Sequence, residues 1–368
     1  IGPGSACARA SAKMNGALSV LASLTAVGFG VGIVVAGPIV DHLGYHWLFL
    51  LPMCATLVAA VTAFLVVPES PVRTPARLPV LPAVLLAFFL VALLLGLSWG
   101  NQYGWLSARV LGLFGLAAVA GWAWISTELR VPVPMIDMHL MRLRGMWTAN
   151  VVAGAMGFAT FAAFGFVPQL LQTPTEAGYG FGASITESGY LLVPSAVASF
   201  LVGFSTARLI SWMGARVVIG TGLMLAGLSF LSIAFFHQAT WQLYAATTVQ
   251  GVGSGLVFSS LAGVVIAAVP AEQTGVASGM NANIRTIGGS LGAAVMAGIV
   301  TAHVGPTGFP VERGYTVGFA VMGVVMMLAT FAAALIPDLR TQPTRNHLAD
   351  AENAELGFVP GAGAVGQR

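Results

Sequence analysis

The sequence predicts an all-α protein, a polytopic bundle of about ten transmembrane helices. Each predicted helix is long enough to cross the hydrocarbon core of a bilayer. Of its 368 residues, 57% are hydrophobic and only 7% are charged, whereas about a quarter of the residues of a soluble domain are charged. Because a water-soluble fold needs polar groups to cover its exterior, this composition indicates that lipid surrounds most of the chain. The apolar residues also fall into long runs separated by short polar connections.

Each predicted span is a stretch of about 20 mainly apolar residues, the length that a helix needs to cross the hydrocarbon core. In chain order, the stretches are 15–37, 47–67, 79–99, 107–127, 146–170, 188–207, 215–236, 241–268, 275–302 and 314–336. Several contain Gly, Ser and Thr at close spacing, which lets helices approach closely in lipid. We therefore expect the spans to pack against one another.

The connections between the spans carry their basic residues mostly on one side. That side holds Arg9, Lys13, Arg73, Arg77, Arg130, Arg142, Arg144, Arg208, Arg216, Arg340, Arg345 and Arg368. The other side holds Arg109 and Arg313 together with Asp41, His42, Glu176, Glu187, His237 and His303. Because cytoplasmic connections are enriched in Lys and Arg, the asymmetry predicts a multi-pass protein of the cell membrane with both ends of the chain in the cytoplasm.

The residues that enzymes, metal sites and nucleic-acid surfaces use are scarce or unsuitably spaced. Cys7 and Cys54 have no metal-binding or redox spacing, and the outer histidines lack the tight spacing of metal ligands. No glycine-rich loop is followed by Lys and Ser or Thr, so we expect no direct use of ATP. The basic residues form no stripe. We therefore expect no enzymatic activity, no metal, no cofactor and no nucleic-acid partner.

One basic side chain, Arg285, falls inside a predicted span. At a rise of 1.5 Å per residue it lies about 15 Å from the start of its helix. A charge at that depth normally faces protein or a water-filled cavity, which suggests a role on a substrate path or as partner of an acid. The alternative is a side chain that reaches back to the cytoplasmic surface and anchors the helix. Asn281 lies one turn below Arg285 and continues a polar stripe.

Three amides, Asn150, Gln169 and Gln250, also fall inside predicted spans. An unpaired amide is unfavourable in lipid, so each needs a partner on another helix or water in a cavity. Hydrogen bonding between helices is the default interpretation for all three, and a place on a substrate or proton pathway is the alternative. The run of small residues that follows Gln250 favours a cavity slightly at that position.

Three runs of sequence carry a family resemblance. Gly28, Gly37 and Pro38 form a Gly-x8-Gly-Pro run, residues 203–216 read GFSTARLISWMGAR, and residues 275–292 read GVASGMNANIRTIGGSLG. In order, these resemble the antiporter motif, the second cytoplasmic gating loop and the penultimate span of major facilitator superfamily exporters. The resemblance is to the fourteen-span drug:proton antiporter branch and runs from Lys13 to Pro337.

The resemblance implies roles for particular residues. Gly28, Gly37 and Pro38 would act in conformational change, and Arg208, Gly214 and Arg216 in the gating loop. Two departures are visible. Asp41 and His42 replace a glycine pair that usually follows the antiporter motif, and Ser211 stands where the gating loop usually has an acidic residue.

The resemblance also implies a domain organisation in which this chain holds the fifth to fourteenth spans of a longer transporter. Residues 1–67 would end an N-terminal bundle with two spans, and residues 68–145 would hold two extra central spans with cytoplasmic linkers. A short interfacial helix is predicted at 135–144. Residues 146–336 would form a C-terminal six-span bundle, and residues 337–368 a disordered cytoplasmic tail.

The function implied by the resemblance is proton-coupled efflux of amphipathic organic compounds by alternating access. The expected partners are a small organic substrate, protons and membrane lipid, the energy source is the proton gradient, and the protein is expected to be a monomer. Two alternatives stay open: a dedicated exporter of one metabolite or antibiotic, and a membrane fragment or scaffold that does not transport.

Overall fold

The computed structural model describes residues 32, 35–40, 42–66, 80–131, 134, 138–269, 273–305 and 308–337. Within these ranges, nine helices are long and apolar enough to cross a membrane. They match the nine predicted spans from 47–67 onward and confirm the all-α transmembrane architecture. Most of the first predicted span, 15–37, lies outside the described residues, as does nearly all of the predicted tail.

The helices begin and end close to their predicted limits. The spanning helices are α2 (Trp47–Val66), α3 (Val80–Tyr103), α4 (Ala108–Glu128), α6 (Arg144–Gln172), α7 (Ile185–Met213), α8 (Ala215–Phe235), α9 (Thr240–Ala268), α10 (Thr274–Val300) and α11 (Glu312–Ala334). Two short elements complete the described helices, α5 (Met138–Arg142) and the 3-10 helix η1 (Thr175–Ala177).

Two elements differ from the prediction for local reasons. Helix α7 begins earlier because Ser184 and Glu187 form a capping box, in which each side chain accepts a hydrogen bond from the other's backbone N–H. The helix predicted at 135–144 is shorter in the described residues. The extended backbone of Leu143 separates α5 from α6, so Arg144 begins the long helix instead of ending the short one.

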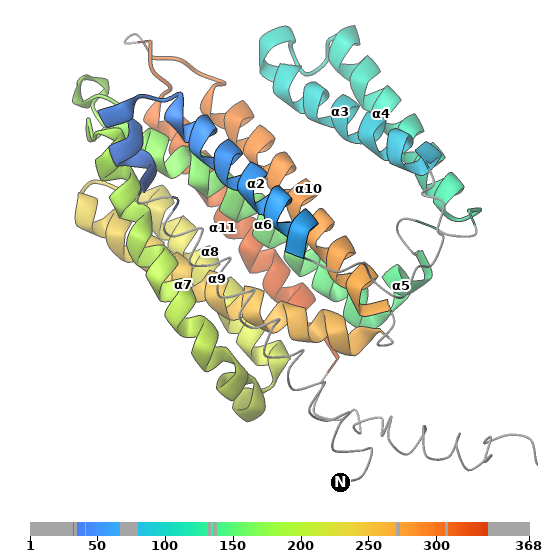
Figure 1. Ribbon diagram of the computed structural model, residues 1–368. Coiled ribbons are helices and arrows are strands. Elements are labelled where there is room, and N and C mark those ends of the chain that lie inside the picture. The colour runs from blue at the N-terminus through green and yellow to red at the C-terminus, as the bar shows by residue number, and fades with distance from the viewer. Residues whose placement is uncertain are drawn as a thin grey trace, which may run out of the picture.

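Helices α6 to α11 form a bundle around a common hydrophobic core (Figure 1). The closest pairs are α6 with α10, α8 with α11, α7 with α9, and α8 with α9. The largest fully buried side chains include Tyr315, Phe230 and Phe319. Helices α3 and α4 pack together as a hairpin, and α3 contacts α10. We call the end of the bundle with the α6–α7, α8–α9 and α10–α11 connections the His303 end, and the opposite end the Gly214 end.

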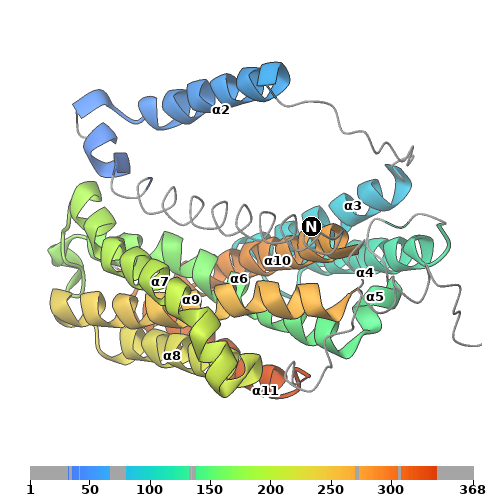
Figure 2. The ribbon, with the colours of Figure 1, turned by 60° about the horizontal axis from the view of Figure 1, so that its bottom comes forward.

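Helix α2 lies apart from this bundle (Figure 2). None of its residues is buried, although its sequence is strongly apolar. Its packing therefore contributes nothing to the core, and the candidate site is built from the bundle of α6 to α11.

Candidate functional site

The two asparagines predicted for the pathway meet between α6 and α10. Nδ2 of Asn281 donates to Oδ1 of Asn150 at 2.9 Å and to the carbonyl oxygen of Ala149 at 3.3 Å. Nδ2 of Asn150 contacts the sulfur of Met141 in α5 at 2.9 Å. Both asparagines are buried. Their amides are thus paired by protein groups, as lipid-embedded amides require.

Glycines bring α6 and α10 into backbone contact on either side of Arg285. A Cβ atom added to Gly157 would overlap the backbone carbonyl of Arg285, and one added to Gly288 would overlap the backbone of Gly154. Only glycine permits this separation, which is typical of tightly packed membrane helices. The backbone of Arg285 is therefore held firmly against α6.

The side chain of Arg285 extends toward α9. Its guanidinium carbon lies 5.3 Å from the centre of the Phe258 ring, a geometry in which the ring face attracts the cation. Phe258 is about 15 Å from the last residue of α9, and Arg285 is about as far from the first residue of α10. Because both lie at the same depth, the side chain crosses between helices instead of running toward the Gly214 end. In the described part of the chain, no carboxylate is recorded as its partner.

Gln250 joins α9 to α7. Its Oε1 accepts a hydrogen bond from Oγ of Ser195 at 3.0 Å, and its Nε2 donates to Oγ of Ser254 at 2.9 Å. A Cβ added to the next residue, Gly251, would overlap the backbone of Ser195. The amide therefore cross-links two closely packed helices.

Gln169 behaves differently from the other predicted amides. Its side chain is exposed on α6, near the His303 end. The neighbouring Gln172 instead donates from Nε2 to Oγ of Ser188 at 2.7 Å and so links α6 to α7. The structure thus brings Asn150, Asn281, Gln250 and Arg285 to the contacts among α6, α7, α9 and α10, and leaves Gln169 outside them.

The end of the predicted antiporter motif contacts α7. Gly37 is buried, and a Cβ added to it would lie 2.7 Å from the Cα of Thr186 at the start of α7. Pro38 follows at a partly buried position in the same helical turn. Gly28 lies outside the described residues, so the contact is defined for the second glycine of the motif.

The predicted gating loop is the junction between α7 and α8. Gly214 has a φ of 88° and is the single residue between the two helices, a conformation that favours glycine. Arg208 and Arg216 are exposed on either side of it. The hydroxyl of Ser211 donates to the carbonyl of Arg208 at 2.7 Å. A carboxylate at position 211 would have no hydroxyl to donate in this way.

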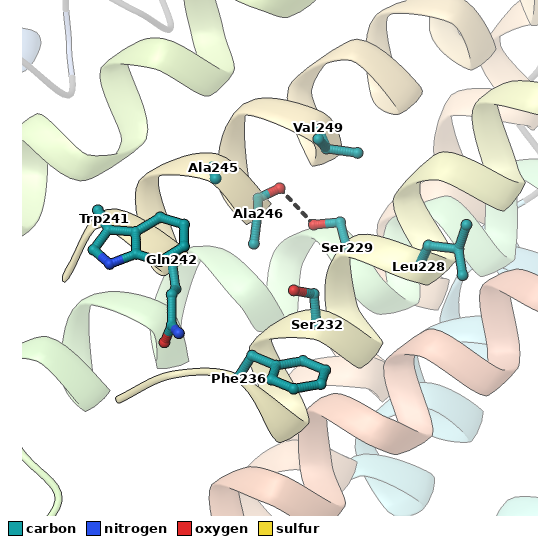
Figure 3. Close-up of a pocket in the computed structure, with 9 residues that line it drawn as sticks. All are labelled: Leu228, Ser229, Ser232, Phe236, Trp241, Gln242, Ala245, Ala246 and Val249. Atoms are coloured by element: carbon teal, nitrogen blue, oxygen red, sulfur yellow. Dashed lines mark hydrogen bonds between the residues drawn. The ribbon is translucent and has the colours of Figure 1, made fainter. Parts of the chain in front are cut away.

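A cavity of about 430 Å³ lies between α8 and α9, toward the His303 end (Figure 3). Its lining is mainly apolar, and the hydroxyl of Ser229 donates to the carbonyl of Ala246 at 2.6 Å. Trp241 and Phe236 at its rim are largely exposed. None of the site residues predicted from the sequence lines this cavity.

Sequence reasoning missed the partners of the predicted residues. Ser254 carried a usable signal, because it lies one helical turn after Gln250. Phe258 and Ser195 carried none, because each is brought to its partner by the packing of separate helices. The fold and this constellation of in-span polar side chains define a multi-pass membrane protein of the helical transporter type.

Comparison with known proteins identifies the family. Residues 146–362 match the model of the Major Facilitator Superfamily, and this chain belongs to that family. It is 26% identical over 297 residues to the multidrug transporter protein MdtP of Bacillus subtilis, covering 80% of this chain and 53% of the relative. It is 25% identical over 357 residues to the tetracenomycin C resistance and export protein of Streptomyces glaucescens, covering 96% and 61%.

A third relative is the multidrug efflux pump LfrA of Mycolicibacterium smegmatis. It is 25% identical over 333 residues, covering 88% of this chain and 64% of the relative. The chain therefore spans about half to two thirds of the length of these curated relatives.

Proposed function

We propose that the protein exports amphipathic organic compounds in exchange for protons, and that α6, α7, α9 and α10 supply one half of its transport site. The chain belongs to the Major Facilitator Superfamily, and the observation that carries the proposal is the position of Arg285 near the middle of the apolar helix α10, with its guanidinium group over the Phe258 ring. A charged group at this depth is costly and is characteristic of substrate and ion pathways. The relatives MdtP and LfrA, a multidrug transporter protein and a multidrug efflux pump, support export of several drugs.

The proposed mechanism is alternating access around a midplane site. Arg285 with Phe258 forms a polar and aromatic surface for the substrate. Asn281 with Asn150, and Gln250 with Ser195 of α7, fix the helices that carry this surface. Gly37 packs on α7 at the His303 end, with Pro38 next to it in the chain. Arg208, Gly214 and Arg216 form the gate at the Gly214 end. Gln169 is proposed as a pathway residue only at the His303 end of α6, where its side chain is exposed.

We place the protein in the cell membrane as a monomer, with the Gly214 end in the cytoplasm. The support is the distribution of basic residues, since Arg208 and Arg216 lie at the Gly214 end and basic residues favour the cytoplasmic side. The proton gradient supplies the energy in this proposal, and no cofactor takes part.

The proposal is tested by expressing the full-length protein in cells that lack their own drug exporters. Cells with the protein should accumulate less of an amphipathic dye, and a protonophore should abolish the difference. Arg285→Gln should raise accumulation to the level of empty cells, while Arg285→Lys should retain part of the activity. Unchanged accumulation across a broad panel of dyes and antibiotics would contradict export of several compounds.

Arg109 provides a matched control for these variants. Its guanidinium carbon also lies over an aromatic ring, 5.1 Å from the centre of Tyr103, but it belongs to α4, away from the candidate site. Arg109→Gln removes the same charge and the same kind of ring contact. We expect it to leave dye export unchanged. Equal loss in Arg109→Gln and Arg285→Gln would mean that the effect comes from general damage to the fold.

A dedicated exporter of one metabolite or antibiotic is the second candidate. The relative from Streptomyces glaucescens, named for resistance to and export of tetracenomycin C, favours it and covers 96% of this chain. Resistance to one compound without dye export would select this function. Absence of both, with the protein correctly inserted, would select the scaffold that does not transport.

A further inference from the structure

A histidine and a glutamate meet at the His303 end of the bundle. His237 lies in the turn between α8 and α9, and its side chain is 7% exposed. Glu312 is the first residue of α11, and its side chain is 51% exposed. Nε2 of His237 lies 2.9 Å from Oε1 of Glu312. The contact joins the α8–α9 turn to the start of α11. It pairs the buried imidazole of His237 with the solvent-exposed carboxyl group of Glu312.

Both nitrogens of the His237 ring face hydrogen-bond acceptors. Nδ1 lies 2.8 Å from the carbonyl oxygen of Ile233, which only accepts, so Nδ1 carries a proton. The second bond, between Nε2 and the carboxyl group, needs a proton either on Nε2 or on Glu312. In both cases the pair holds one proton more than a neutral imidazole beside a carboxylate. That proton belongs to the pair and not to either residue alone.

We propose that His237 and Glu312 form a proton-binding site, and that the bound proton holds the start of α11 against the α8–α9 turn. Loss of the proton leaves the Nε2 lone pair facing the carboxylate oxygen across a short distance. This arrangement is repulsive, so the contact opens when the proton leaves. The charge distribution of the connections places this end outside the cell, where the half-exposed Glu312 connects the site to external water.

Other titratable groups at this end include Glu176, Tyr179, Glu187, Tyr244, His303, Arg313 and Tyr315. Within the described residues, Glu312 is the only ion-pair partner of His237. Burial raises the pKa of the Tyr179 phenol, the Thr173 hydroxyl offsets part of this rise, and the charge of Glu312 adds to it. Tyr179 therefore stays a neutral donor, and its hydroxyl bonds to the Pro310 carbonyl just before α11.

The sign of the pH effect follows from counting protons. Where the folded pair keeps its proton and the separated side chains of the unfolded chain have lost theirs, the folded state binds more protons. Stability then falls as pH rises. One proton of difference changes the ratio of folded to unfolded protein by at most about tenfold per pH unit.

The test is thermal unfolding of the full-length protein in detergent between about pH 5 and about pH 9, a range that brackets histidine titration. Glu312→Gln keeps a hydrogen-bonding partner for a neutral ring and removes the need for the extra proton. His237→Gln removes the ring. We expect the melting temperature of the wild type to fall with pH across this range, and each variant to show a flatter dependence.

Matched controls come from the same end of the bundle. His303→Gln and Glu176→Gln make the same changes at exposed side chains outside the pair, and both should keep the wild-type pH dependence. The double variant of His237 and Glu312 should be no flatter than either single variant, because the two residues act as one site. A wild-type pH dependence in Glu312→Gln would overturn the proposal, even if His237→Gln failed to fold.

A transport measurement separates this site from the export function. If the protein exports dye, its rate should depend on external pH more steeply in the wild type than in Glu312→Gln, because the proton gradient that drives export changes with pH in both. If no dye is exported, the unfolding measurement still decides whether the proton site exists. The two proposals can therefore fail independently.

Discussion

Two buried asparagines show how individual residues fix the helices of the candidate site. The side-chain amide of Asn281 donates hydrogen bonds to Asn150 and to the Ala149 carbonyl oxygen. The α6–α10 contact is therefore held by polar groups as well as by close packing. Interhelical hydrogen bonds in membrane proteins contribute about 0.6 kcal/mol on average and up to about 1.7 kcal/mol. A bond of this size is enough to favour one helix register over its neighbours.

Asn281→Ala should destabilise the protein by about 0.5 to 2 kcal/mol, because it leaves Oδ1 of Asn150 without its donor. Thermal unfolding in detergent should show a lower melting temperature. Asn283→Ala is the control, since Asn283 is exposed on the same helix two residues away. An equal fall in melting temperature in both variants would show that the Asn150–Asn281 hydrogen bond does not stabilise the protein.

At the residue scale, the sequence predicted which side chains need partners but not which partners they find. Depth along a helix identified Arg285, and the cost of buried amides identified Asn150 and Gln250. Phe258, Ser195 and Ile233 were not predicted, because each meets its partner through the packing of separate helices or a turn. Gln169 shows the reverse case, since position within a span does not reveal which face of the helix is covered.

At the scale of elements, the α6–α10 pair is a seam of glycines. Gly154 and Gly157 on α6 lie against Gly288 and the Arg285 backbone on α10, and a Cβ at Gly292 would overlap the backbone of Phe158. The glycine-rich middle of this span predicted tight packing from the sequence. The identity of the opposing helix required the structure, because small residues permit an approach without specifying the partner.

Gly288→Ala should separate α6 from α10 and destabilise the protein by about 1 to 3 kcal/mol, the usual cost of overpacking. Gly279→Ala is the matched control on the same helix, because a Cβ there has no neighbouring heavy atom within 4 Å. The control should be neutral or slightly stabilising, since alanine favours helix more than glycine does. Melting temperatures in detergent distinguish the two outcomes.

The contact between Gly37 and Thr186 predicts an effect on export. Gly37→Ala places a methyl group 2.7 Å from the Thr186 Cα and should reduce dye export at least about tenfold, because a displacement of about 1 Å far from the site can cost that much. Gly32→Ala, where a Cβ meets nothing within 4 Å, should export normally. Equal export by both variants would exclude a conformational role for this contact.

At the scale of the whole molecule, composition and span length predicted the number and the limits of the described spanning helices. All nine spanning helices were predicted to within a few residues at most ends, because the bilayer fixes the length that each must have. Helix α7 exceeded its predicted limits because the capping box of Ser184 and the positive φ of Gly214 fix its ends, and neither signal is hydrophobic. The pairing of α7 with α9 and of α8 with α11 is not encoded in hydropathy at all.

The predicted orientation can be measured with single cysteines in a protein whose own cysteines are replaced by alanine. A thiol reagent that cannot cross membranes should label His303→Cys in intact cells. It should label Ser211→Cys only after the membrane is opened, because the distribution of basic residues predicts that the Gly214 end lies inside. Labelling of Ser211→Cys in intact cells would reverse the orientation.

Gly214 has one more consequence, which concerns mechanics. Met213 ends α7 and Ala215 begins α8, so a single residue joins these two helices, whereas longer, hydrogen-bonded connections separate α6 from α7 and α10 from α11. A tilt of α7 must therefore pull the near end of α8 with it. Because α8 packs closely on α11, a movement of α8 is transmitted to α11. The longer connections at the His303 end then accommodate the difference in position between neighbouring helices.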